Sequence, residues 1–222
     1  MDSKGAEAAR PFIKPDPSQY PWFVFELMGW DPDTSSLAAP AYPCLIDENH
    51  RIADLYGMIN VPAAVWINED GKIVRPPDNA GACDAFRTMD RTTFKMEKEA
   101  AAEARDNRRA YIAALRDWIE NDAGSKYVIA DDELLMRLSG PDPASQLAAA
   151  GFRLGLVLNR LGRNREAQSQ FAEAQRLSPE NWSYKRQVWE LEQPGKAAGP
   201  EFWSAVDALG DKHYYPPNAF VE

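Results

Sequence analysis

Side chains capable of nucleophilic or metal chemistry are few in this sequence. Cys44 and Cys83 are its only cysteines, and His50 and His213 are its only histidines. Redox cysteines commonly stand as Cys-x-x-Cys, and metal-binding Cys and His residues stand in short, regular spacings. The four residues here are far apart and match neither pattern. The sequence therefore predicts no metal site and no cofactor, and it leaves two single thiols as the possible reactive groups.

The reactivity of each thiol depends on its surroundings, because the thiolate is the reactive form. Cys44 lies in the apolar run 42–47, which predicts a strand ending in Asp47. A small buried residue is the favoured interpretation of Cys44, and a redox role is the alternative. Cys83 follows a loop rich in proline and glycine and is expected near the surface. Arg87 and Arg91 lie close by in sequence and favour a lowered thiol pKa there.

Residues 55–74 show the clearest local order in the chain. Gly57 can end an apolar helix in a left-handed cap. Residues 63–67 form an apolar, β-branched and aromatic run of strand length. The turn residues 69–71 follow, with Gly71 free to adopt positive φ, and a second strand begins at Ile73. Arg75-Pro76-Pro77 is expected to end that strand, because proline donates no hydrogen bond to a sheet.

This segment resembles the second half of a thioredoxin-like domain of the thiol:disulfide interchange and peroxidase type. In that family a Val/Ile-Pro loop with a cis proline precedes a strand. The resemblance implies that Pro62 is the cis proline and that Val61, Pro62 and Ala63 line the groove that receives a substrate chain. An ordinary Val-Pro turn is the alternative. The resemblance supplies no nucleophile, because no residue here matches the redox motif.

The start of the chain falls in the middle of such a domain. Residues 1–3 resemble the end of a strand and residues 5–13 the helix after it, so the first strand, the redox motif with its helix, and the second strand are missing. Some relatives carry selenocysteine in that motif, and its UGA codon can be read as a stop. The upstream DNA tests this hypothesis.

Residues 15–41, rich in proline and aromatic residues, resemble an insertion that is either an extra packed element or an exposed patch for a partner.

The second half of the sequence is helical. Residues 97–122 predict a long helix, and residues 131–138 a short one with an acidic first turn. The stripe of the long helix that is expected to pack on another helix comprises Tyr111, Ile112, Leu115, Trp118 and Ile119. Residues 214–217 are expected to form a tail.

Residues 148–181 resemble one tetratricopeptide unit of ~34 residues. The matching positions are Leu154-Gly155, Ala167, Phe171, Ala174 and Pro179. Gly151 departs from the large apolar residue usual there. One such unit cannot bury its own faces, so the stripe at 111–119 and the aromatic run at 182–189, capped by Asn181, are expected to cover it.

Composition limits the classes of partner. The chain has 222 residues, 45% of them hydrophobic, and a net charge of −9. This acidity disfavours nucleic acid, which needs clustered Lys and Arg. No run reaches the ~18–20 apolar residues of a membrane span, and the N-terminus lacks the apolar core of a signal peptide. The chain is therefore expected in the cytoplasm, away from membranes.

The predicted fold class is α/β plus all-α. An incomplete thioredoxin-like sheet at 1–95 precedes a helical domain at 96–222. The predicted function is that of a redox-family protein, acting on a protein, thiol or peroxide substrate, that lacks its catalytic Cys or Sec motif and so has little thiol oxidoreductase activity. The alternative is a non-catalytic scaffold that binds a protein through the repeat-like helices. A third possibility is a chain that folds poorly, because a lost strand bares a sheet edge.

Overall fold

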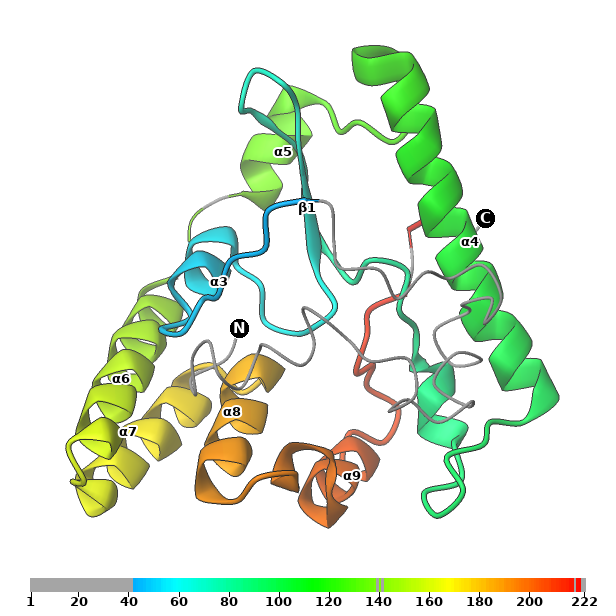
Figure 1. The fold of residues 1–222 in the computed structure, drawn as a ribbon. Coiled ribbons are helices and arrows are strands. Elements are labelled where there is room, and N and C mark those ends of the chain that lie inside the picture. Colours follow the sequence, from blue (N-terminus) through cyan, green and yellow to red (C-terminus); the bar gives the residue numbers. More distant parts are fainter. Residues whose placement is uncertain (1–41, 139, 141, 218, 221–222) are drawn as a thin grey trace. The chain divides into compact units, whose positions relative to one another are not determined.

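The computed structural model describes residues 42–138, 140, 142–217 and 219–220. Within them the chain forms seven α-helices and one two-stranded antiparallel sheet (Figure 1). The predicted mixture of a small sheet and many helices is confirmed at this level. The thioredoxin-like and tetratricopeptide-like assignments stay predictions. The strand end expected at 1–3, the helix at 5–13 and the insertion at 15–41 lie outside the described residues.

The chain divides into two compact units, and each is built from separate stretches. Among the described residues, Cys44–Val61 and Leu138–Ala208 make up one, here called the helical unit. Residues 42–43, Pro62–Arg137 and residues 209–220 make up the other, here called the hairpin unit. The predicted domain boundary between residues 95 and 96 was placed where the sequence pattern turns helical, and it stays a prediction.

The helical unit contains five α-helices and one short 3-10 helix. They are α3 (Arg51–Tyr56), α6 (Pro143–Arg160), α7 (Asn164–Leu177), α8 (Trp182–Glu192), η4 (Lys196–Ala198) and α9 (Pro200–Asp207). Asp142 caps α6 by accepting the backbone N–H groups of Ala144 and Ser145, with Pro143 at the first helical position. Asn181 caps α8 by accepting the N–H of Tyr184, as predicted.

The core of the helical unit lies between α6, α7 and α8. Gly155 on α6 faces the buried ring of Phe171 on α7, and a side chain at position 155 would overlap that ring. The rest of this core consists of Ala148, Phe152, Leu156, Leu158, Ala167, Ala174, Tyr184 and Val188. Helix α8 therefore packs on the α6–α7 pair, which confirms the prediction for the run at 182–189 but not for the stripe at 111–119, which packs with the hairpin residues.

The strand predicted at residues 42–47 is wrong. These residues form no strand, and Cys44 and Leu45 are exposed rather than buried, Leu45 by 90%. An isolated extended run cannot bury its backbone groups without a neighbouring strand. Asp47 instead holds the start of α3, where its two carboxylate oxygens accept the N–H groups of Arg51 and Ala53 at 2.8 and 2.9 Å. Helix α3 then ends at Gly57 in the predicted left-handed conformation.

The hairpin unit is organised around β1 (Ala64–Ile67) and β2 (Ile73–Asp78). The turn between them is the predicted one, with Gly71 at φ 76°. The expectation that prolines end the second strand is wrong. Trp66 pairs with Arg75 and Ala64 with Asp78, so the second strand holds one extra residue between these pairs. This bulge contains Pro76 and Pro77. Proline has no backbone N–H, and at a bulge this removes no hydrogen bond between the strands.

Helix α4 (Lys98–Asn121) packs on the hairpin rather than on another helix. The Trp66 indole N–H donates to the Tyr111 hydroxyl at 3.1 Å, and the indole stacks with the rings of Trp118 and Phe220. Of the predicted stripe on α4, Tyr111 is buried, Leu115 and Trp118 are half-buried, and Ile112 and Ile119 are exposed. Two short helices, η2 (Asp84–Thr88) and η3 (Asp122–Gly124), and α5 (Asp131–Arg137) complete the unit.

Residues 214–217 are not a loose tail. The carboxylate of Asp84 accepts the N–H groups of Tyr214 and Tyr215 at 3.1 and 2.7 Å. Arg87 donates to the carbonyl oxygens of Gly210 and Lys212. These bonds hold the last described stretch of the chain against η2, and Tyr214 is buried as a result.

Candidate functional site

The three residues predicted to line a substrate groove precede β1. Val61 and Pro62 are exposed, and Ala63 is half-buried. Val61 ends a stretch of the helical unit, and Pro62 begins the hairpin unit. Their role as a substrate groove stays a prediction.

The two thiols of the chain lie in different units and differ in exposure. Cys44 is exposed in the helical unit, and Cys83 is half-buried before η2 in the hairpin unit. Burial raises the pKa of the Cys83 thiol, and the N–H of Ala85 and the charge of Arg108 offset this only in part. The expectation that Arg87 and Arg91 lower that pKa is wrong. Arg87 is held instead by Asp84 and by the chain at 210–212.

A partly buried polar cluster, which the sequence did not reveal, joins α3 to α6 and α8. Tyr184 donates its hydroxyl hydrogen to Asp54 Oδ1 at 2.5 Å, and Arg153 Nη1 lies 3.8 Å from Asp54 Oδ2. His50 is fully buried, with its ring edge-on to Phe152 at 5.1 Å. Burial raises the pKa of Asp54 and, with the nearby carboxylate, that of Tyr184. The cluster anchors α3 within the helical unit.

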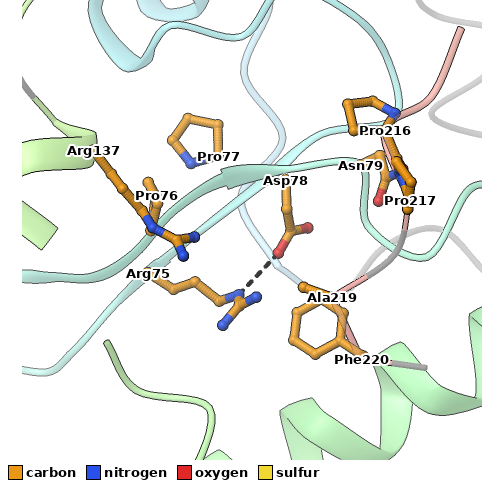
Figure 2. A pocket seen from close by; sticks show the side chains of 10 residues that line it. All are labelled: Arg75, Pro76, Pro77, Asp78, Asn79, Arg137, Pro216, Pro217, Ala219 and Phe220. Atoms are coloured by element: carbon orange, nitrogen blue, oxygen red, sulfur yellow. Dashed lines mark hydrogen bonds and ion pairs between the residues drawn. The ribbon is translucent and has the colours of Figure 1, made fainter. Parts of the chain in front are cut away.

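The hairpin unit contains a pocket of about 150 Å³ beside β2 (Figure 2). It is lined by Arg75, Pro76, Pro77, Asp78, Asn79, Arg137, Pro216, Pro217, Ala219 and Phe220. The bulge in β2 and the anchored segment at 214–217 bring these residues together. The pocket thus has apolar walls of proline and phenylalanine and two guanidinium groups among its polar groups.

Arg75 is the central polar group of this pocket. Its side chain is only 9% exposed. Its Nε donates a hydrogen bond to Asp78 Oδ2 at 3.2 Å (Figure 2). Its Nη1 donates to the Tyr127 carbonyl at 2.9 Å, and its guanidinium carbon lies 4.2 Å from the centre of the Phe220 ring. Its Nη2 donates no hydrogen bond to any residue in the described part of the chain. Burial raises the pKa of Asp78, against its hydrogen bonds from Ala80 and Arg75.

A second candidate surface lies on α6. Five apolar residues on this helix and at its end are exposed, and we call them the α6 seam: Leu147, Ala150, Leu154, Val157 and Leu161. They recur at alternating intervals of three and four residues, so they share one face of the helix. The opposite face of α6 packs on α7 (Figure 1). Helix α6 is therefore apolar on two faces, only one of which is covered within the helical unit.

Compared with family models, curated proteins and solved structures, the chain matches none. No helix between residues 51 and 207, within the described part of the chain, combines the length and apolar character needed to cross a membrane. The described residues also contain no group of three or more His, Cys, Asp or Glu side chains placed to hold a metal ion.

Proposed function

We propose that this protein is a non-catalytic binding module that holds an amphipathic helix of a partner protein on the α6 seam. The observation that carries the proposal is the exposure of this apolar face: Leu147 is 60% exposed, Leu154 48% and Leu161 67%. Single exposed leucines are ordinary on protein surfaces, but a contiguous apolar stripe marks an interaction site.

The spacing of the seam suits a helix as its occupant. Alternating intervals of three and four residues are the a and d positions of a heptad, which accept the side chains of a second helix. From Leu147 to Leu161 the seam is about 21 Å long at 1.5 Å per residue. A partner helix of about four turns would cover it. The small side chain of Ala150 gives room for a large residue of the partner.

Charge at the edge of the seam favours an acidic partner. Arg153 and Arg160 lie along one edge, and α6 contains no Asp or Glu. Their ion pairs with Asp54 and Glu48 are long, at 3.8 and 3.7 Å. Two copies of α6 paired antiparallel through this face would bring arginines together, which costs free energy. A helix with Asp or Glu beside its apolar stripe meets the arginines favourably instead.

Two designed peptides test this proposal. Both carry leucine at the a and d positions; one has glutamate at the flanking positions and the other has lysine. We expect saturable binding of the glutamate peptide by fluorescence anisotropy, weakening as salt is raised, and much weaker binding of the lysine peptide.

The Leu154→Glu variant places a charge in the middle of the seam and should weaken binding of the glutamate peptide at least tenfold. Its matched control is Ile119→Glu, which adds the same charge to an exposed isoleucine on α4 and should leave binding unchanged. Failure of both peptides to bind, or equal binding by wild type and Leu154→Glu, contradicts the proposal. A dimer in sedimentation equilibrium that Leu154→Glu dissociates would make a second copy the occupant, which also contradicts it.

The redox function rests on the resemblance to a thioredoxin-like domain and stays a prediction. The raised thiol pKa of Cys83 works against thiolate chemistry at neutral pH. Of the two functions considered from the sequence, we therefore favour protein binding.

A further inference from the structure

We propose that the pocket beside β2 in the hairpin unit binds a small organic carboxylate that has an aromatic or compact apolar body. This site is separate from the α6 seam and does not depend on the function proposed for it. Its basis is the meeting of two guanidinium groups with apolar walls in one pocket (Figure 2).

The charges in the pocket favour an anion, although the chain as a whole carries −9. Arg75 and Arg137 line it, against one carboxylate, Asp78. Both oxygens of Asp78 already accept hydrogen bonds, from the Arg75 Nε–H and from the N–H of Ala80. An incoming carboxylate therefore meets donor groups rather than an unpaired negative charge.

Donors for that carboxylate come from two elements. Arg75 Nη2 has no hydrogen-bond acceptor among the described residues, although the side chain is nine-tenths buried. Arg137 reaches from α5 toward β2, and its one ion pair, with Glu133, is about half exposed (Figure 2). Guanidinium groups bind carboxylates through short, charge-assisted hydrogen bonds, which are stronger than neutral ones.

The walls fit the body of such a ligand. Phe220 and the proline pairs 76–77 and 216–217 present flat apolar surfaces around the two arginines. A volume of about 150 Å³ suits a group of about the size of benzene. An anion that has no apolar group, such as phosphate, would leave these apolar walls without a contact.

Benzoate, benzamide and inorganic phosphate are the probes that test this site on the full chain. Chemical shifts of the Arg75 side-chain N–H and the Asn79 amide are followed by NMR during each titration. We expect saturable shifts with benzoate and affinities at least about tenfold weaker for benzamide, which lacks the charge, and for phosphate, which lacks the ring. Benzamide or phosphate binding as tightly as benzoate, or shifts that rise without saturating, would overturn the proposal.

The variant for this test is Arg137→Gln, because Arg137 is exposed and Arg75 holds the fold together. We expect about tenfold weaker benzoate binding. Arg176→Gln is the matched control, because Arg176 makes the same kind of exposed, one-turn ion pair, with Glu173 on α7. Equal affinity in wild type and Arg137→Gln, or an equal loss in both variants, would overturn the assignment of the carboxylate to this pocket.

Discussion

Replacing Gly155 with alanine tests how closely α6 packs on α7. A Cβ at this position would lie within 3.0 Å of two ring carbons of Phe171, closer than such atoms normally approach. The ring is only 1% exposed and belongs to the core of the helical unit, so it has little room to move. Overpacking of this kind typically costs about 1–3 kcal/mol.

Gly151 provides an internal control in the same helix. A Cβ there would meet its nearest atom, Oε1 of Gln170, at 3.6 Å, which is ordinary contact. Alanine in place of glycine stabilises a helix by about 1 kcal/mol. We therefore expect Gly151→Ala to stabilise the protein by up to about 1 kcal/mol. Gly155→Ala gains the same helix propensity but also incurs the overpacking cost, so the free energies of unfolding of the two variants should differ by about 1–3 kcal/mol.

Urea unfolding followed by far-UV circular dichroism measures the free energy of unfolding of both variants. Because the chain has two units, hydrogen exchange of the α6 and α7 amides gives the stability of the helical unit separately. A double-mutant cycle with Phe171→Leu identifies the ring as the obstacle, since the smaller side chain should relieve part of the cost. Equal stability of Gly155→Ala and Gly151→Ala, within about 0.5 kcal/mol, would refute the close packing.

Two further predictions concern buried or anchored carboxylates. Burial raises the pKa of Asp54 in the folded protein above its value of 3.8 in the unfolded chain. The stability that protonated Asp54 contributes is therefore fully present below pH 3.8, and it is lost as the pH rises through the pKa of the folded state. Asp54→Asn keeps an acceptor for the Tyr184 hydroxyl and cannot ionise. Thermal melts from about pH 4 to about pH 7 should therefore show the stability of this variant rising relative to wild type. A stability difference that does not change with pH would contradict this. Asp84→Asn replaces one acceptor oxygen by a donor, so amide exchange at Tyr214 and Tyr215 should become about tenfold faster, and unchanged exchange would show that these bonds do not hold the segment.

Features that depend on neighbouring residues could be predicted from the sequence. The hairpin turn at Gly71, the end of α3 at Gly57 and the Asn181 cap follow from backbone preferences and short-range hydrogen bonds, and all are present. The long helix at 98–121 follows from its helix-forming composition and periodicity. The α6 seam could also have been found, because residues at intervals of three and four share a helix face whatever the rest of the fold is.

Errors arose where a segment's structure depends on distant residues. The run at 42–47 has the composition of a strand, but a strand needs a neighbour, and none pairs with it among the described residues. Pro76 and Pro77 were expected to end β2, but the bulge opposite β1 accommodates them. In the same way, helical periodicity identified the Tyr111 stripe but could not show that its partner is the hairpin rather than a helix.

The sequence by itself determined several local elements of this protein: the extent of the long helix, the end of α3, the hairpin turn, and which helix faces are apolar. Only the tertiary structure decided which side chains meet. Asp54 and Tyr184 are 130 residues apart in sequence, as are Asp84 and Tyr214, and Arg75 contacts Tyr127 across 52 residues. Such pairs carry no local signal, because each depends on packing between elements whose order along the chain does not reveal their neighbours. Both the pocket at Arg75 and the partly buried cluster at Asp54 belong to this class.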